Sequence, residues 1–152
     1  MIAVGLAVLL AFTLLAACVT PSGSLGGYSK EDFKNAGLDT NMPRINGTAV
    51  RLSDENLKTL RAQDAVIVIK WTGSDVDSYT ALNNWLTDND YGDSDDDSDD
   101  GLLVCSYRKI NEPDDFEASV LYAERKTEIG DKGDLMEILR GDLILIIYDS
   151  PR

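Results

Sequence analysis

Hydrophobic and polar residues fall into distinct blocks along the chain, and the blocks predict short elements of both kinds. A stretch without any charged residue runs from Ile2 to Ala17, and a glycine- and serine-rich segment follows it. Further along, residues 65–71 and 143–148 are near-continuous apolar runs with several β-branched residues, and residues 102–107 are nearly so. A strand with one exposed face would alternate, so these runs predict strands that are covered on both faces.

Capping residues mark the starts of the predicted helices. Ser29, with Asp32 three residues later, predicts a short helix that ends at Gly37, and Ser53 predicts a second helix that turns Leu57 and Leu60 inward. Residues 77–87 place their large apolar side chains on one helical face. The segment 135–140, with Asp134 before it and Gly141 after it, is predicted as a fourth helix.

The remaining segments predict strands and one hairpin. Residues 48–52 predict a strand after an Asn-Gly turn, and residues 102–110 and 117–129 predict two strands joined around positions 111–115. This order of elements predicts an α/β (α+β) fold: a single small domain over residues 28–152, with a mixed β-sheet covered by short helices and one β-hairpin.

The end of the first apolar stretch reads Leu15-Ala16-Ala17-Cys18. This pattern resembles the lipobox of bacterial lipoproteins, in which the cysteine receives a diacylglycerol and becomes the new N-terminus. The resemblance implies a signal peptide at residues 1–17 and a lipid-attachment site at Cys18. An uncleaved membrane anchor or ordinary signal cleavage are the alternatives, since no Lys or Arg precedes the apolar stretch.

The segment that follows Cys18 has the composition of a flexible tether. Residues 18–27 are an acylated cysteine and a glycine- and serine-rich linker in this interpretation. By resemblance to lipoproteins of Gram-negative cells, Val19 after the cysteine favours the outer membrane. We therefore expect a lipid-anchored protein of the cell envelope that faces the periplasm.

The acidity of the chain is concentrated in one place. The formal net charge is −13, and eight of the 27 acidic residues lie between positions 88 and 100 with no basic residue among them. A run of like charges predicts a solvated, disordered acidic loop. Nucleic acid is excluded as an expected partner because phosphate binding needs clustered Lys and Arg. A cationic partner could bind the aspartates of this loop: Asp93, Asp95, Asp96, Asp97, Asp99 and Asp100.

The same loop invites comparison with a calcium site. Asp96-x-Ser98-x-Asp100-Gly101 matches the start of an EF-hand-like loop, but Tyr107 stands where the bidentate glutamate is needed. Asp96 and Asp100 are therefore candidates only for loose binding of a divalent cation, and no other cofactor is expected.

Catalysis has little support in the residue types. The chain has no histidine, which removes the commonest general base. Cys105 is the second of two cysteines and is expected to be a buried packing residue. We therefore expect a non-enzymatic protein that binds another envelope protein.

In overall plan the chain is similar to small periplasmic α/β lipoproteins that act as accessory or assembly factors. This similarity rests on the anchor and the order of elements alone. The alternatives are an acidic inhibitor or immunity-type protein against a cationic envelope target, and an enzyme or metal-dependent module.

Overall fold

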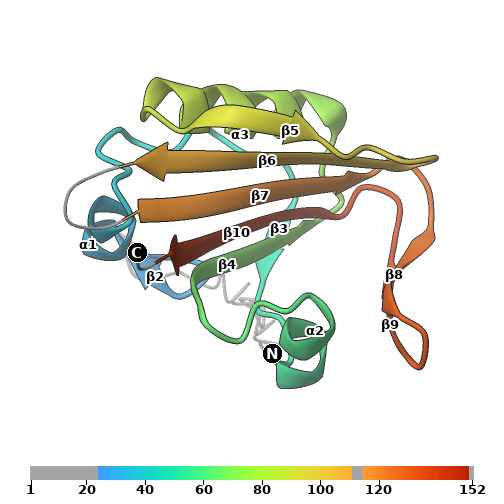
Figure 1. Ribbon diagram of the computed structural model, residues 1–152. Coiled ribbons are helices and arrows are strands. Elements are labelled where there is room, and N and C mark those ends of the chain that lie inside the picture. Colours follow the sequence, from blue (N-terminus) through green and yellow to red (C-terminus); the bar gives the residue numbers. More distant parts are fainter. Residues whose placement is uncertain (1–23, 111–114, 151–152) are drawn as a thin grey trace, which may run out of the picture.

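The computed structural model describes residues 24–110 and 115–150, which form an α+β fold around one antiparallel sheet (Figure 1). The six strands of this sheet lie in the order β3–β4–β10–β7–β6–β5, and each pairs with its neighbours in antiparallel fashion. Their bounds are Thr48–Val50 (β3), Ala65–Thr72 (β4), Gly92–Asp96 (β5), Leu102–Ile110 (β6), Asp115–Ala123 (β7) and Leu143–Ser150 (β10). The prediction of a mixed sheet is therefore wrong, because no two strands of the described sheet are parallel.

The first two helices begin where their capping serines predict, and the third begins one residue before the predicted start. Ser29 and Asp32 form a reciprocal capping box at the start of α1 (Lys30–Asn35), Ser53 caps α2 (Asp54–Thr59) and Asp75 caps α3 (Val76–Asp88). Helix α1 ends in a Schellman motif: Gly37, at φ +71°, donates to the carbonyl of Lys34, and Leu38 donates to that of Phe33.

Strands β4 and β10 are buried on both faces, as their apolar runs predict, whereas β6 is only half-buried over residues 102–106. On β10, Leu143, Leu145 and Ile147 belong to the larger core, which α1 and α3 cover, whereas Ile144 and Ile146 face the smaller core on the other side. Helix α2 and a separate two-stranded hairpin cover that smaller core (Figure 1). On β4, Val66 departs from this pattern, since its exposed fraction is 41 %.

The fourth predicted helix is a strand. Residues 127–138 form a hairpin of β8 (Thr127–Asp131) and β9 (Asp134–Ile138), which turns at Gly133 with φ +99°. Met136 and Ile138 are buried while Leu135 and Leu139 are exposed, which is the two-residue period of a strand. The predicted strand over 117–129 is accordingly two strands, β7 and β8. A small separate pair, β1 (Ser24–Leu25) and β2 (Tyr28–Ser29), precedes α1.

The acidic segment 88–100, expected as a disordered loop, contains structure over most of its length. Helix α3 extends to Asp88, and Asn89 and Tyr91 are buried. Strand β5 then pairs with β6 as the edge of the sheet, and residues 97–101 form the tip of this hairpin. The expected hairpin between β6 and β7 is also present, but its connection at 111–114 lies outside the described residues.

A buried ion pair fixes the chain where it enters β10. The Nζ of Lys70 lies 2.7 Å from a carboxylate oxygen of Asp142, which is 2 % exposed. The same carboxylate accepts the backbone N–H of Leu139 at 2.9 Å. The pair therefore joins the turn before β10 to the neighbouring strand β4.

Candidate functional site

The predicted acidic residues occupy the exposed edge and tip of the β5–β6 hairpin. Asp93, Asp95 and Asp96 lie on β5, and Asp97, Asp99 and Asp100 lie in the tip. The side chains of Asp95, Asp96, Asp97, Asp99 and Asp100 are all exposed. Cys18, the predicted lipid-attachment site, lies outside the described residues.

The interactions of these aspartates are those of a turn. A carboxylate oxygen of Asp96 accepts the backbone N–H of Ser98 at 3.0 Å, and hydrogen bonding to the Ser98 side chain and backbone lowers the pKa of Asp96. The backbone N–H of Asp97 donates to the carbonyl of Val104, while the carboxylate of Asp100 pairs with Arg125. Asp96 and Asp100 thus have separate neighbours. Over residues 24–110 and 115–150, no group of three or more potential metal ligands comes together.

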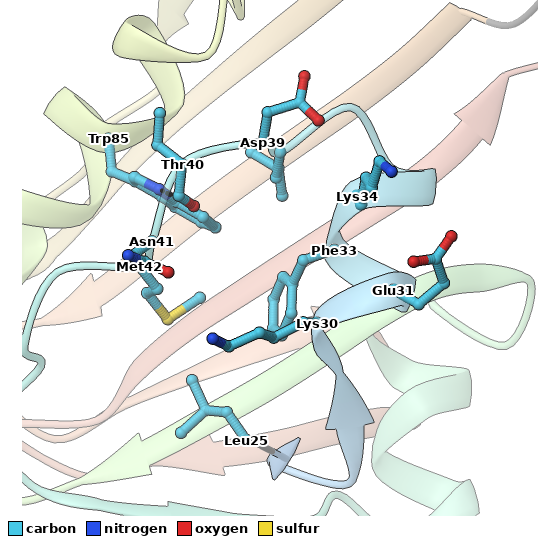
Figure 2. A pocket seen from close by; sticks show the side chains of 11 residues that line it. Leu25, Lys30, Glu31, Phe33, Lys34, Asp39, Thr40, Asn41, Met42 and Trp85 are labelled. Carbon is cyan, nitrogen blue, oxygen red and sulfur yellow. Dashed lines mark hydrogen bonds between the residues drawn. The ribbon is translucent and has the colours of Figure 1, made fainter.

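A pocket of about 420 Å³ lies between α1, the segment 38–42 and α3. We call it the α1–α3 pocket, and Figure 2 shows the side chains that line it. Its apolar lining comes from Leu25, Phe33, Leu38, Met42 and Trp85. The rings of Phe33 and Trp85 meet edge to face, with their centroids 6.2 Å apart. Exposed polar side chains surround this floor: Lys30, Glu31, Lys34, Asp39, Thr40 and Asn41.

Asn89 holds the segment 38–42 against α3. Its side-chain carbonyl accepts the backbone N–H of Thr40 at 3.2 Å, and its amide nitrogen donates to the Thr40 hydroxyl and to the Trp85 carbonyl, each at 2.7 Å. The indole N–H of Trp85 donates to the Thr40 carbonyl at 3.3 Å. One wall of the pocket is therefore fixed to the helix that forms another.

Lys109 and Tyr91 hold the end of α1 in the same way. The Nζ of Lys109, a residue that is 6 % exposed, donates to the carbonyls of Gly37 and Asn89 at 2.6 Å each. The hydroxyl of Tyr91 donates to the carbonyl of Ala36 at 2.6 Å, and burial raises the pKa of Tyr91. The pocket is thus preformed, because Asn89, Tyr91 and Lys109 tie its three walls together.

The composition of the acidic segment concealed two of these three residues. Asn89 and Tyr91 lie among aspartates, and the charge of that segment predicts a disordered loop. The signal in the sequence was Tyr91 itself, because a large aromatic ring inside a charged run indicates a residue that packs against the fold. Lys109 lies near the end of β6 between the exposed Arg108 and Ile110, and its inward-facing position could be located only with the fold known.

Cys105 is a packing residue, although it is less buried than expected. It lies half-buried on β6 and packs against the larger core beside Leu103 and Tyr79. Burial, and next the neighbouring Cys105, raise the pKa of Tyr107 and of Tyr79.

Comparison with known proteins adds no family to this picture. A scan against family models finds no match for the chain, and searches among curated proteins and solved structures find none either. Among the residues that the structure describes, no helix is both long and apolar enough to cross a bilayer.

Replacing Lys109 tests whether its hydrogen bonds to Gly37 and Asn89 stabilise the fold. In Lys109→Met the carbonyls of Gly37 and Asn89 lose a charged donor, and we expect the free energy of unfolding to fall by about 2–3 kcal/mol. Urea denaturation followed by circular dichroism measures this change. Lys132→Met, on the exposed turn of the β8–β9 hairpin, is the matched control and should change stability by less than about 0.5 kcal/mol. An equal loss of stability in the two variants would contradict this role of Lys109.

The raised pKa of Tyr91 predicts a loss of stability in alkali. Since the unfolded chain releases the tyrosine proton near its ordinary pKa of about 10, stability falls as the pH rises above that value. Tyr79, Tyr107 and Tyr148 contribute in the same direction. Tyr91→Phe should be less stable than the parent at pH 8, because a hydrogen bond is lost, yet should lose less stability between pH 8 and alkaline pH. Unfolding curves at each pH measure both effects, and an equally steep loss in the variant would contradict the assignment.

Proposed function

We propose that this chain is a lipid-anchored envelope protein that binds another envelope protein without catalysis, as an accessory or assembly factor. The observation that carries the proposal is the preformed α1–α3 pocket. Its apolar floor is open to a ligand, and its walls are already fixed, so binding would cost little ordering of the chain. Helix α1, which lines the pocket, lies at the opposite end of the sheet from the tip of the β5–β6 hairpin (Figure 1).

The expected anchor supports an envelope location. The Leu15–Cys18 pattern resembles a lipobox, and Leu25, on the wall of the pocket, is only seven residues beyond Cys18. Seven residues reach at most about 25 Å even when fully extended. A lipid on Cys18 would therefore keep the pocket close to the surface of a membrane, which we expect to be the outer membrane on its periplasmic side.

The residue types support binding rather than catalysis. The chain contains no histidine, and its second cysteine packs against the core rather than lining the pocket. The buried polar groups of Asn89, Tyr91 and Lys109, which hold the pocket walls, are already engaged with backbone carbonyls and amides. They are positioned to support the walls and not to react.

A second candidate function is supported by the acidic hairpin. Its aspartates are exposed, and within the described part of the chain only Asp100 among those from 95 to 100 forms an ion pair. Such a surface would steer a cationic partner by long-range attraction, as an inhibitor or immunity-type protein would require. Loose binding of a divalent cation at this tip has no support from the grouping of ligands.

Lipidation predicts different behaviour for the two cysteines. Cys18→Ser should abolish incorporation of labelled palmitate and shift the protein from the membrane fraction to the soluble fraction. Cys105→Ser is the matched control, since it removes a thiol from the folded domain, and it should keep both the label and the membrane location. Retention of label by Cys18→Ser would contradict the lipoprotein assignment.

The pocket and the hairpin predict different losses of a partner. We expect proteins captured from envelope extract by the full chain to be lost from Met42→Glu, which puts a charge into the pocket floor. They should be retained by Leu135→Glu, an exposed leucine elsewhere, and by a variant with Asp95, Asp96, Asp97, Asp99 and Asp100 changed to Asn. Mass spectrometry of the captured proteins at low and moderate salt makes the comparison.

The opposite pattern has a clear meaning. Loss of the partner from the aspartate variant and at moderate salt, with retention by Met42→Glu, would overturn binding at the pocket and favour the acidic-inhibitor function.

A further inference from the structure

A second pocket adjoins the α1–α3 pocket. We call the α1–α3 pocket the first hollow and its neighbour the second hollow. The second hollow has a volume of about 260 Å³ and is lined by Leu25, Met42, Pro43, Arg44, Ile45 and Trp71. Leu25 and Met42 line both hollows, so these two side chains form the ridge between them. Two apolar hollows on either side of a ridge suit two separate side chains of one peptide better than one continuous acyl chain.

The floors of the two hollows favour large apolar groups. Phe33 and Trp85 contribute aromatic rings to the first hollow, and Trp71 contributes to the second. Met42, on the ridge, has a flexible thioether side chain that can adapt to the shape of its neighbour. Aromatic and large aliphatic side chains are the usual anchors in pockets of this kind.

Basic side chains line both hollows, although the protein as a whole is acidic. Lys30 and Lys34 line the first hollow and Arg44 lines the second, and none of the three forms an ion pair within the described residues. In Figure 2 the side chain of Lys30 extends across Phe33 toward Leu25 and Met42, at the end of the pocket that adjoins the second hollow.

The acidic residues of the pocket lie elsewhere. The carboxylate of Glu31 points away from the floor, and Asp39 stands at the opposite end of the pocket from Lys30 (Figure 2). Within the part of the chain that the structure describes, the second hollow has no acidic residue in its lining. The ridge is therefore flanked by Lys30 on one side and Arg44 on the other, and among residues 24–110 and 115–150 no carboxylate lines the pocket there.

From this arrangement we infer that the two hollows together bind a peptide segment of a partner protein that carries two large apolar side chains and an acidic residue between or beside them. The apolar side chains occupy the hollows, and the carboxylate lies over the ridge near Lys30 and Arg44. This inference rests on the proposed function and adds the chemical class of the partner segment. Charge complementarity would set its specificity, since a basic segment would meet two uncompensated cations.

Peptide selection with a charge-reversed variant tests the inference. The full chain, anchored in zwitterionic nanodiscs, is used to select from a library of displayed random peptides, in parallel with the double variant Lys30→Glu/Arg44→Glu. We expect the parent to enrich Asp or Glu beside paired large apolar residues. The variant should enrich Lys or Arg at the same place. Lys58→Glu/Lys132→Glu carries the same change of charge on exposed sites remote from the pocket and should select as the parent does.

Tryptophan fluorescence gives a second readout, because Trp71 and Trp85 are the only tryptophans of the chain and each lines one hollow. An enriched acidic peptide should shift the emission of the parent, and its affinity should fall roughly tenfold or more in Lys30→Glu/Arg44→Glu. The control variant should bind it as the parent does.

The failures of the two proposals are distinguishable. Apolar peptides without an acidic preference, or a preference that charge reversal leaves unchanged, would overturn this inference and leave binding at the pocket intact. Failure to enrich any peptide that shifts the tryptophan emission would overturn both. A shift caused by anionic nanodiscs alone would overturn the peptide in favour of a lipid.

Discussion

Lys109 joins two helices to the sheet through a single buried ammonium group. The last carbonyls of a helix have no partner within the helix and carry partial negative charge. Lys109 extends from β6 and donates to the carbonyl of Asn89, which caps the end of α3, and to that of Gly37, just past the end of α1; its Nζ lies 5.6 Å from the centroid of the Tyr91 ring. These backbone dipoles and the aromatic face compensate a charge that would otherwise be costly to bury. The spacing between the two helices, and with it the width of the pocket, depends on this contact.

Each of the two faces of the sheet carries its own hydrophobic core. The larger core takes the side chains that point toward α1 and α3, where the pocket is built, and the smaller core takes those that point toward α2 and the β8–β9 hairpin. The hairpin can cover a face of the sheet although it is not a helix, because β9 turns Met136 and Ile138 inward. The buried Lys70–Asp142 pair lies at the junction between this hairpin and β10. The contacts that hold the pocket side of the sheet, around Lys109, are thus separate from the Lys70–Asp142 pair that holds the side with the β8–β9 hairpin.

Local signals in the sequence predicted much of the fold. The capping serines located two helix starts, Gly37 located a helix end, and the runs of β-branched residues located the buried strands. The segment 134–140 was predicted wrongly because Leu135, Ile138 and Leu139 also fit a helical spacing, and burial of Met136 with Ile138 distinguishes the two periods only in the folded chain. Apart from the β6–β7 hairpin, the pairing of strands could not be predicted, since antiparallel and parallel arrangements bury the same apolar runs. The pocket was missed for a related reason: its residues come from four separate segments, and no local pattern connects Leu25 and Phe33 with Met42 and Trp85.

The position of the aspartates on an outer strand has a consequence for molecules that stand close together. The sheet ends at β5 on one side and at the three-residue strand β3 on the other. An open strand edge offers backbone donors and acceptors to any similar edge nearby, and such edges join readily into aggregates. Two copies that approached through β5 would bring two rows of carboxylates face to face, while β3 is too short to template an extended pairing. Crowding on a surface would therefore not join neighbouring copies through the edges of this sheet.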